Sequence, residues 1–267
     1  MPDPSPIRVA IVSGGTFGIG HAITMLLAGR GYRVVAFGLD AAQPGSTAEA
    51  GSYVTAQLLE EAGLSADLLE ADVSIAADVQ RVVEQAIGRY GRVDALVNNA
   101  AIHPRGNALT TTEAIWDRVM DVNLKGMFLC AKSVIPHMVS GGGGAIVNVG
   151  SAAGWGKQNL LAYAASKGGV HALTMALAYD HLHDHIRVNC VLPGGTLTGM
   201  TASLGGPNFL QQASNTASGE VTRPEDVAAA CAFLLSDDAG QISGSMLDVG
   251  CFAGQGGPIP DRPASRQ

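Results

Sequence analysis

Short runs of apolar residues alternate along the chain with longer stretches in which apolar and polar residues follow helical spacing. The short runs predict buried strands at 7–13, 32–37, 68–71, 95–97, 145–149, 186–192 and 246–249. The longer stretches predict helices from the first glycine cluster to Arg30, from the 41–52 loop to about Gly63, and at 78–90, 112–139, 161–182 and 223–236. This alternation is typical of repeated βα units, which build a parallel sheet covered by helices.

Length and composition favour a single α/β domain. The chain has 267 residues, of which 47% are hydrophobic, so a large core is available. Only 15% are charged, and 35 are glycines, a mixture that suits buried parallel strands joined by tight turns. No internal repeat or linker divides the chain. We therefore expect one domain over 7–250, with tails at 1–6 and 251–267.

Charge and cysteine usage exclude several classes of protein. Sixteen basic and twenty-three acidic side chains give a net charge of −7, so neither a nucleic acid nor an anionic membrane is an expected partner. No apolar run reaches the roughly 18 residues that span a bilayer, and the first residues lack the basic and apolar regions of a signal peptide. The four cysteines have no CxxC spacing. A soluble, cytoplasmic protein is the remaining expectation.

A glycine-rich turn follows the first predicted strand. Its sequence is Ser-Gly-Gly-Thr-Phe-Gly-Ile-Gly over residues 13–20. Glycines allow a tight turn, bring backbone N–H groups close to a pyrophosphate and let the next helix pack closely on the strand. The N-terminus of that helix favours an anion. Chance glycines in a glycine-rich chain are the alternative, but the position between a buried strand and a helix favours a dinucleotide site.

Tyr163 and Lys167 are four residues apart on a predicted helix and therefore share one face. A nearby ammonium group favours the phenolate, so we expect Lys167 to lower the pKa of Tyr163 and make it a proton donor and acceptor near neutral pH. Ser151 follows the fifth strand and is placed to bind the same substrate oxygen. Asn123 stands within a predicted helix, although asparagine is a poor helix former. An ordinary surface pair, a turn serine and a structural asparagine are the alternatives.

The combination of these motifs resembles the classical short-chain dehydrogenase/reductase family. The resemblance rests on the glycine turn, Asn98-Asn99-Ala100, Asn123, Ser151 and the Tyr163-xxx-Lys167 pair, in that order. It continues through further segments at 186–189, 193–194, 223–228 and 248–250, and so covers about residues 7–250. Two departures are Ala101, where the family usually has glycine, and Val249, which replaces the first glycine of the usual Asp-Gly-Gly ending.

The resemblance implies a single-domain, doubly wound Rossmann-like fold with a seven-stranded parallel sheet flanked by helices, usually assembled as a homotetramer. It implies hydride transfer between a nicotinamide cofactor and a carbonyl or alcohol carbon. Tyr163 is then the general acid/base, Ser151 binds the substrate oxygen, and Lys167 also binds the nicotinamide ribose. Asn123 supports a water relay for protons.

The resemblance also assigns cofactor contacts to the ends of several strands. Besides Tyr163 and Lys167, these contacts are Gly14, Thr16, Phe17, Gly18 and Ile19 at the pyrophosphate, Gly38 and Leu39 after the second strand, Asp72 and Val73 at the adenine, Asn99, Ala100 and Ala101 after the fourth strand, and Pro193, Gly194, Thr196 and Thr198 at the carboxamide and nearby phosphate.

The end of the second strand favours NAD over NADP. An acidic residue there binds the ribose 2′-OH, whereas an arginine accommodates a 2′-phosphate. Gly38 takes the place of the usual aspartate, but no Arg or Lys follows it, and Phe17 occupies a turn position that is often basic in NADP users. A 2′-phosphate without a cation is poorly compensated. Asp40 biases the field further. The extra segment at 43–53 is expected to be a surface loop, and a position beside the adenosine pocket is the alternative.

Five residues are expected to line the substrate pocket: His103, Ser151, Trp155, Gln158 and Tyr163. The segment 198–222 corresponds to the family's substrate lid; it is short, with Phe209 as its one aromatic residue. We expect no metal site. His181, His183 and His185 alternate near a helix end and are best explained as a solvated turn.

The expected substrate is therefore a small secondary alcohol or ketone. A 3-oxoacyl carrier-protein reductase is the alternative enzyme, which would use basic residues such as Arg105 and Lys157 at the mouth of the site. A nucleotide-sensing protein without catalysis is the alternative outside enzymes, but both Tyr163 and Lys167 are present.

Overall fold

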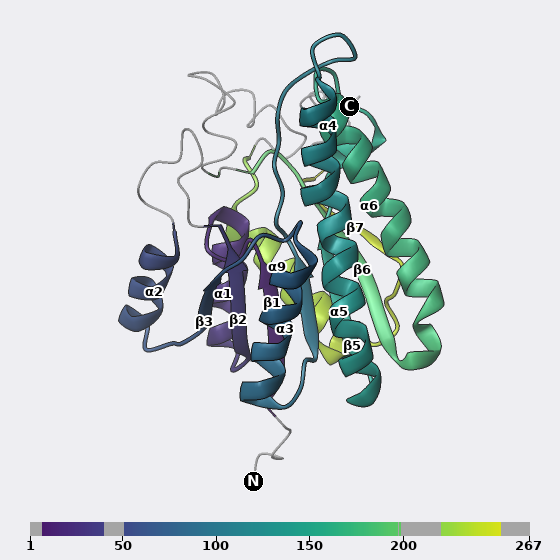
Figure 1. Cartoon of the computed structure of the whole chain (residues 1–267). Helices are drawn as coiled ribbons and strands as arrows, with labels where there is room; N and C mark the ends of the chain where they lie inside the picture. The colour runs from purple at the N-terminus through teal and green to yellow at the C-terminus, as the bar shows by residue number, and fades with distance from the viewer. Residues whose placement is uncertain (1–6, 40–50, 197, 199–219, 252–267) are drawn as a thin grey trace, which may run out of the picture.

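Seven parallel strands form one continuous sheet in the computed structural model, which describes residues 7–39, 51–196, 198 and 220–251 (Figure 1). The strands are β1 (Val9–Ser13), β2 (Arg33–Gly38), β3 (Asp67–Glu70), β4 (Ala95–Asn98), β5 (Gly144–Val149), β6 (Ile186–Pro193) and β7 (Met246–Val249). Their order across the sheet is β3-β2-β1-β4-β5-β6-β7, and every neighbouring pair is parallel. The expected seven-stranded, doubly wound Rossmann-like fold is confirmed.

Helices cover both faces of this sheet. They are α1 (Gly18–Gly29), α2 (Ser52–Glu61), α3 (Ala76–Tyr90), α4 (Glu113–Met120), α5 (Gly126–Ser140), α6 (Leu161–Asp180) and α9 (Pro224–Leu235). Short turns of helix lie at η1 (Asp121–Lys125), η2 (Ala152–Trp155), η3 (Leu182–Asp184) and η5 (Asp237–Ala239). Helices α1 and α9 pack together on one face, while α3 and α5 pack on the other.

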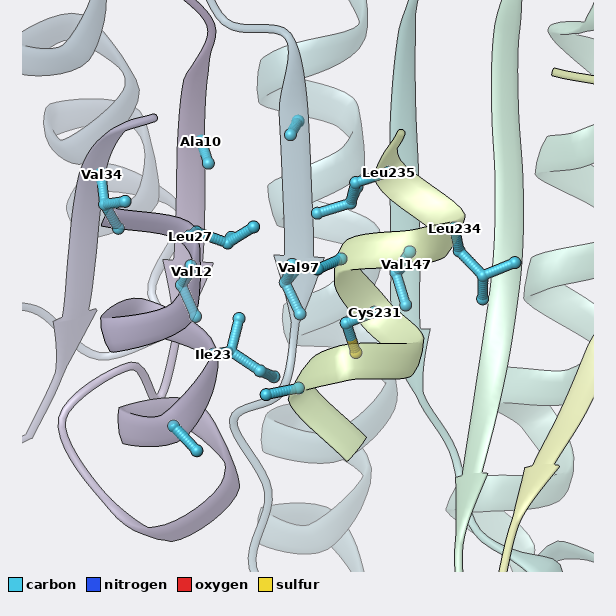
Figure 2. Packing of buried hydrophobic residues seen from close by; sticks show 14 of the residues in the cluster. Ala10, Val12, Ile23, Leu27, Val34, Val97, Val147, Cys231, Leu234 and Leu235 are labelled. Atoms are coloured by element: carbon cyan, nitrogen blue, oxygen red, sulfur yellow. The ribbon is translucent and has the colours of Figure 1, made fainter. Parts of the chain in front are cut away.

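Alternating strand residues supply the two halves of the core. Ala10 and Val12 of β1 point to the face covered by α1 and α9, while Ile11 between them points to the face covered by α3 and α5. Figure 2 shows Ile23 and Leu27 of α1 and the residues of α9 directed at the first of these faces. Burial on both faces explains why the strands appear in the sequence as continuous apolar runs.

One predicted helix is interrupted. The sequence predicts a single helix over 112–139, but α4 and α5 are separated by the five-residue π-helical turn η1. The side chain of Asn123 in this turn bonds to the backbone of Ile102, which lies outside the helix. Widening of the helix there places the buried asparagine opposite that backbone, and single π turns of this kind are frequent at functional sites. The remaining boundaries differ from the predicted ones by a few residues, as helix and strand ends commonly do.

The sheet has one point at which the strand order reverses. The chain proceeds outward from β1 to β2 and β3, and then returns to β4 on the other side of β1. Ligands of open α/β sheets bind in the crevice outside the carboxyl ends of the strands at such a point. The turns after β1 and β4 therefore locate the candidate site. The first predicted tail, the second tail beyond Cys251, Asp40 and most of the segments 43–53 and 198–222 lie outside the described residues.

Candidate active site

The glycine turn after β1 is closely packed and ends in the N-terminus of α1. Gly14 has a φ of +61°, a left-handed conformation that favours glycine. A Cβ at Gly14 would lie 2.9 Å from Cα of Ala100, so the backbones after β1 and β4 approach closely. The side chain of Asn99 donates hydrogen bonds to the carbonyl oxygens of Ser13 (3.2 Å) and Gly14 (2.9 Å). The end of β4 thus holds the turn in place.

The geometry of this turn fits a dinucleotide. Backbone N–H groups at the start of α1, a helix dipole and glycines without side chains suit a pyrophosphate. The hydroxyl oxygen of Thr16 is buried and has no hydrogen-bond partner among the described residues. A Cβ atom added to Gly38 would lie 3.6 Å from this hydroxyl oxygen, so Thr16 is close to the end of β2. A buried hydroxyl without a partner is costly and rare in proteins, so a polar ligand group at this position is favoured.

The segment after β6 lies against the same turn. A Cβ at Gly18 would be 3.1 Å from Cγ2 of Thr198, which places Thr198 beside the start of α1. Thr196 is buried and donates to the carbonyl oxygen of Gly194 (3.1 Å). Pro193 is the last residue of β6. The segment after β6 and the glycine turn therefore lie on the same side of the site, and the carboxamide and phosphate contacts stay predictions.

The adenosine side contains two predicted residues whose side chains have other partners. The carboxylate of Asp72 accepts hydrogen bonds from Ser74 (2.6 Å) and Arg118 (2.9 Å), and these bonds hold its pKa below the usual value although burial opposes them. The side chain of Val73 packs against Gly126 at the start of α5. Side-chain contacts from these two residues to an adenine are therefore disfavoured, which leaves their backbone groups for that role.

A contact between α2 and the glycine turn was not predicted from the sequence. Thr55 of α2 is fully buried and donates a hydrogen bond to the carbonyl oxygen of Thr16 (3.1 Å). Nδ1 of His21 lies 2.8 Å from the Thr55 hydroxyl. The ring of Phe17 lies beside Gly51, the residue before α2. This network attaches α2 to the turn. In the sequence, His21 and Thr55 are single polar residues on two helices, and nothing in the local pattern indicates that they are in contact.

Ser151, Tyr163 and Lys167 lie together at the end of β5. Ser151 is the residue two positions beyond β5, while Tyr163 and Lys167 lie on the first two turns of α6. The Ser151 hydroxyl lies close enough to that of Tyr163 to act on its pKa as a hydrogen-bonding partner. Nζ of Lys167 lies 5.7 Å from the centre of the Tyr163 ring and donates a hydrogen bond to the carbonyl oxygen of Val149 (2.7 Å). The predicted pair therefore shares one face with the serine, as helical spacing required.

Burial controls the pKa values of this group, contrary to our expectation. Burial raises the pKa of Tyr163 to about 12, although the hydrogen bond with Ser151 opposes the change. Burial also lowers the pKa of Lys167 to about 8. The prediction that Lys167 brings the pKa of Tyr163 below its ordinary value is therefore wrong for the protein without bound cofactor. Desolvation disfavours both charged forms, and it outweighs an ammonium that lies nearly 6 Å from the ring.

Asn123 is fully buried, and its side chain is committed to structural bonds. Its oxygen accepts from the N–H of Ile102 (2.8 Å), and its amide donates to the Ile102 carbonyl (2.9 Å) and to Ser166 on α6 (3.1 Å). Asn123 thereby joins the segment after β4 to the π turn and to α6. Because both amide hydrogens and one oxygen lone pair are used, a part in a proton relay remains a prediction.

His171 is a site residue that sequence analysis missed. It lies one helical turn after Lys167, and its Nε2 is 3.2 Å from the carbonyl oxygen of Ser151, so Nε2 carries the hydrogen. Lys167 and His171 thus hold the carbonyl groups on either side of Gly150. Trp155, predicted to line the pocket, packs on the His171 ring at 4.6 Å between centres and is 71% exposed. In the sequence, a single histidine on a helix does not indicate a hydrogen bond to the backbone of a distant segment.

The segment after β4 forms another wall. The ring of His103 lies 4.2 Å from the Tyr163 ring, centre to centre, in an edge-on arrangement. Burial lowers the pKa of His103. Gly106 exchanges backbone hydrogen bonds with Asn159 (3.0 Å) and Leu161 (3.0 Å), so the segment containing His103 lies beside the one containing Gln158. Gln158 itself is exposed.

The histidines at 181–185 are arranged as a turn. Nδ1 of His181 lies 2.8 Å from a carboxylate oxygen of Asp184, and His185 adopts a left-handed conformation after η3. Within the described part of the chain, no three His, Cys, Asp or Glu side chains are grouped in a way that suits a metal ion.

Comparison with known proteins identifies the family. A family model described as "Enoyl-(Acyl carrier protein) reductase" matches residues 14–251. A cis-4-hydroxycyclohexanecarboxylate dehydrogenase of Sinomonas cyclohexanicum is 38% identical, over 91% of this chain and 94% of its own. A 3-oxoacyl-(acyl-carrier-protein) reductase of Thermotoga maritima is 33% identical, over 91% and 96%. A solved structure of an actinorhodin polyketide ketoreductase variant with NADPH is 32% identical, covers 93% of this chain and 97% of its own, and has a TM-score of 0.85.

The fold, the glycine turn and these matches define a nicotinamide-dependent oxidoreductase. The chain belongs to the short-chain dehydrogenase/reductase family, as its motifs predict. It is an oxidoreductase that acts on CH–OH donors with NAD(P).

Proposed function

We propose that this protein interconverts a small secondary alcohol and its ketone, with Tyr163 as the group that exchanges a proton with the substrate oxygen. The observation that supports this most directly is the joint placement of Tyr163, Ser151 and Lys167 at one strand end. Bound NAD(P) supplies the chemistry of hydride acceptance or donation at the substrate carbon. The protein's own residues position the substrate oxygen and handle the proton.

Ser151 is suited to donate a hydrogen bond to the substrate oxygen. Its hydroxyl oxygen accepts a hydrogen bond from the N–H of Ala153 (3.1 Å), which does not use the hydroxyl hydrogen, so this hydrogen can be donated to the substrate. His171 and Lys167 fix the backbone on both sides of Gly150, which limits movement of Ser151. In oxidation, Tyr163 takes the hydroxyl proton as the carbonyl forms. In reduction it returns that proton to the developing alkoxide.

The raised pKa of Tyr163 predicts that only the oxidation rate depends strongly on pH between 7 and 10. Oxidation needs Tyr163 ready to accept a proton, so kcat/KM for alcohol oxidation should rise between pH 7 and 10. Ketone reduction needs the protonated phenol and should not show that rise. Above pH 8 the ammonium of Lys167 loses its proton, so the oxidation profile should become less steep than about tenfold per pH unit. Initial rates in both directions test this, and an oxidation rate independent of pH would contradict it.

For the cofactor we propose NAD over NADP. Gly38 ends the strand and Leu39 follows it. A Cβ at Gly38 would lie nearest to Gly14 and Thr16, neither of which is cationic. A 2′-phosphate at this position has no charged partner among them. The ketoreductase variant solved with NADPH shows that the family also accommodates the phosphate.

Titration with NADH and NADPH tests this preference. We expect the Kd for NADPH to be at least about tenfold higher than that for NADH. A Cβ at Gly38 would contact nothing closer than 3.6 Å, so Gly38→Asp fits the site and should widen the ratio by repelling the phosphate. The control is Gly88→Ala in α3, away from the site, which should leave the ratio unchanged. Tighter NADPH binding by the unaltered protein would contradict the proposal.

Reduction of a 3-oxoacyl group on a carrier protein is the second candidate. The Thermotoga relative supports it, as do the exposed Arg105 and Lys157 beside the site, which an acidic carrier would contact. Comparison of a carrier-bound 3-oxoacyl thioester with a small ketone distinguishes the two candidates by kcat/KM. A protein that binds cofactor but converts neither would be the non-catalytic alternative.

We further propose a homotetramer located in the cytoplasm. An apolar groove of about 530 Å³ lies between η1, α5 and α6 and is lined by Leu124, Phe128 and Leu173, among others. Lys125 and Asp121 form an ion pair at its edge, so a two-fold copy would meet complementary charges. Light scattering should give about four times the chain mass of 27.2 kDa.

The state of the cysteines supports the proposed cytoplasmic location. All four cysteines are free, which suits a reducing compartment.

A further inference from the structure

Two segments on the substrate side of the site have a charge opposite to that of the whole chain. Residues 99–112 and 144–179 include Arg105, Lys157 and Lys167 but not one aspartate or glutamate. The whole chain has 23 acidic residues and a net charge of −7. These two segments therefore contribute positive side chains and no acidic ones to the surroundings of Tyr163.

The segments that contain Arg105 and Lys157 lie side by side in the fold. Gly106 and Leu161 are joined by a backbone hydrogen bond of 3.0 Å, and Gly106 and Asn159 by another of 3.0 Å. Arg105 directly precedes one of these paired segments, and Lys157 is two residues before the other. Both side chains are exposed. They therefore extend from neighbouring segments at the rim of the site.

The same rim is connected to the reacting group through His103. Its ring lies 4.2 Å from the ring of Tyr163, centre to centre. Arg105 and Lys167 are both near enough to lower the pKa of His103 by charge repulsion. His103 thus contacts the proton-transfer residue and is also near the outer cation Arg105.

We propose that the substrate carries an anionic group, of which a carboxylate is the simplest, held at the rim by Arg105 and Lys157 while its hydroxyl or ketone oxygen faces Tyr163 and Ser151. His103 lines the path between the two ends and offers a hydrogen bond. This inference rests on the proposed oxidoreductase function and adds the class of substrate. A low-dielectric cleft lined by one sign of charge concentrates ligands of the opposite sign.

Binding of matched ligands tests the inference. The probes are 4-oxopentanoate and 5-oxohexanoate, each paired with its methyl ester and titrated by calorimetry into the enzyme saturated with oxidised cofactor, with which ketones do not react. We expect each acid to bind at least about tenfold more tightly than its ester at about 0.01 M salt. The difference should shrink several-fold at about 0.15 M salt, because the charges are exposed.

Variants identify the residues responsible. Lys157→Gln alone, and Arg105→Gln with Lys157→Gln, should progressively remove the advantage of the acid while the esters and NADH bind as before. Arg30→Gln is the matched control, because it removes one exposed positive charge at the opposite end of α1. The single Lys157 variant keeps the test valid if the double variant is unstable.

Several results would overturn the inference. These are equal Kd values for acids and esters, no binding by either member of any pair, or an acid preference that survives in the variants. A strong preference for a carrier-bound thioester over all the acids would also overturn it, in favour of an acidic protein partner. Failure of the proposed function itself is distinguished by cofactor titration, since it would appear as absence of NADH and NADPH binding.

Discussion

Replacing Tyr163 by phenylalanine should lower kcat by about a hundred- to ten-thousandfold, the range expected when a general acid/base is removed. The ring and its edge-on contact with His103 remain in Tyr163→Phe, so the site keeps its shape. Only the hydroxyl that exchanges a proton with the substrate is lost. Because burial raises the pKa of Tyr163 to about 12, removal of this hydroxyl also relieves a desolvated polar group, and stability should change little.

The measurements for this variant are turnover and cofactor affinity. The Kd for NADH should stay within about twofold of the original value, because the interactions lost belong to the reacting oxygen. Tyr179→Phe is the matched control: Tyr179 lies on the same helix, is 86% exposed and should be neutral. Turnover in Tyr163→Phe near that of the control would show that another group exchanges the proton.

The fold was predictable because burial on both faces makes the strands apolar throughout. The strands β1, β5 and β6 are nearly or fully buried, and each appears in the sequence as a short apolar run. Their order across the sheet was not contained in this pattern. The resemblance to the family implied a doubly wound sheet of seven parallel strands, which is confirmed, and the structure adds the order of the strands.

The details of the site depend on contacts between distant segments, which no local pattern reports. Asn123 was noticed as an unusual helix residue, but the π turn arises from its bonds to Ile102. His171 and Thr55 appear ordinary in the sequence, and their partners are carbonyl groups of other segments. The pKa of Tyr163 was predicted with the wrong direction because helical spacing shows a neighbouring charge but not the loss of solvent.

Replacing Gly20 by alanine should unfold or severely destabilise the protein, although glycine to alanine within a helix usually stabilises. A Cβ at Gly20 would overlap the carbonyl oxygen of Gly14 and lie 2.5 Å from Nδ2 of Asn99. A backbone oxygen cannot move aside as a flexible side chain can, so α1 must shift away from the turn. We expect a loss of at least about 3 kcal/mol in the free energy of unfolding.

The displacement of α1 in Gly20→Ala should also disturb the cofactor site formed by the glycine turn and the N-terminus of α1. Displacement of α1 breaks the hydrogen bonds by which Asn99 holds the turn, and it moves the helix N-terminus from the anion. Gly20→Ala should therefore bind NADH at least about tenfold more weakly where it still folds. Gly88→Ala is the control, since nothing lies within 4 Å of its added methyl group; it should gain about 0.5–1 kcal/mol from helix propensity. Urea unfolding and NADH titration measure both effects, and equal behaviour of the two variants would refute the close packing of α1 on the turn.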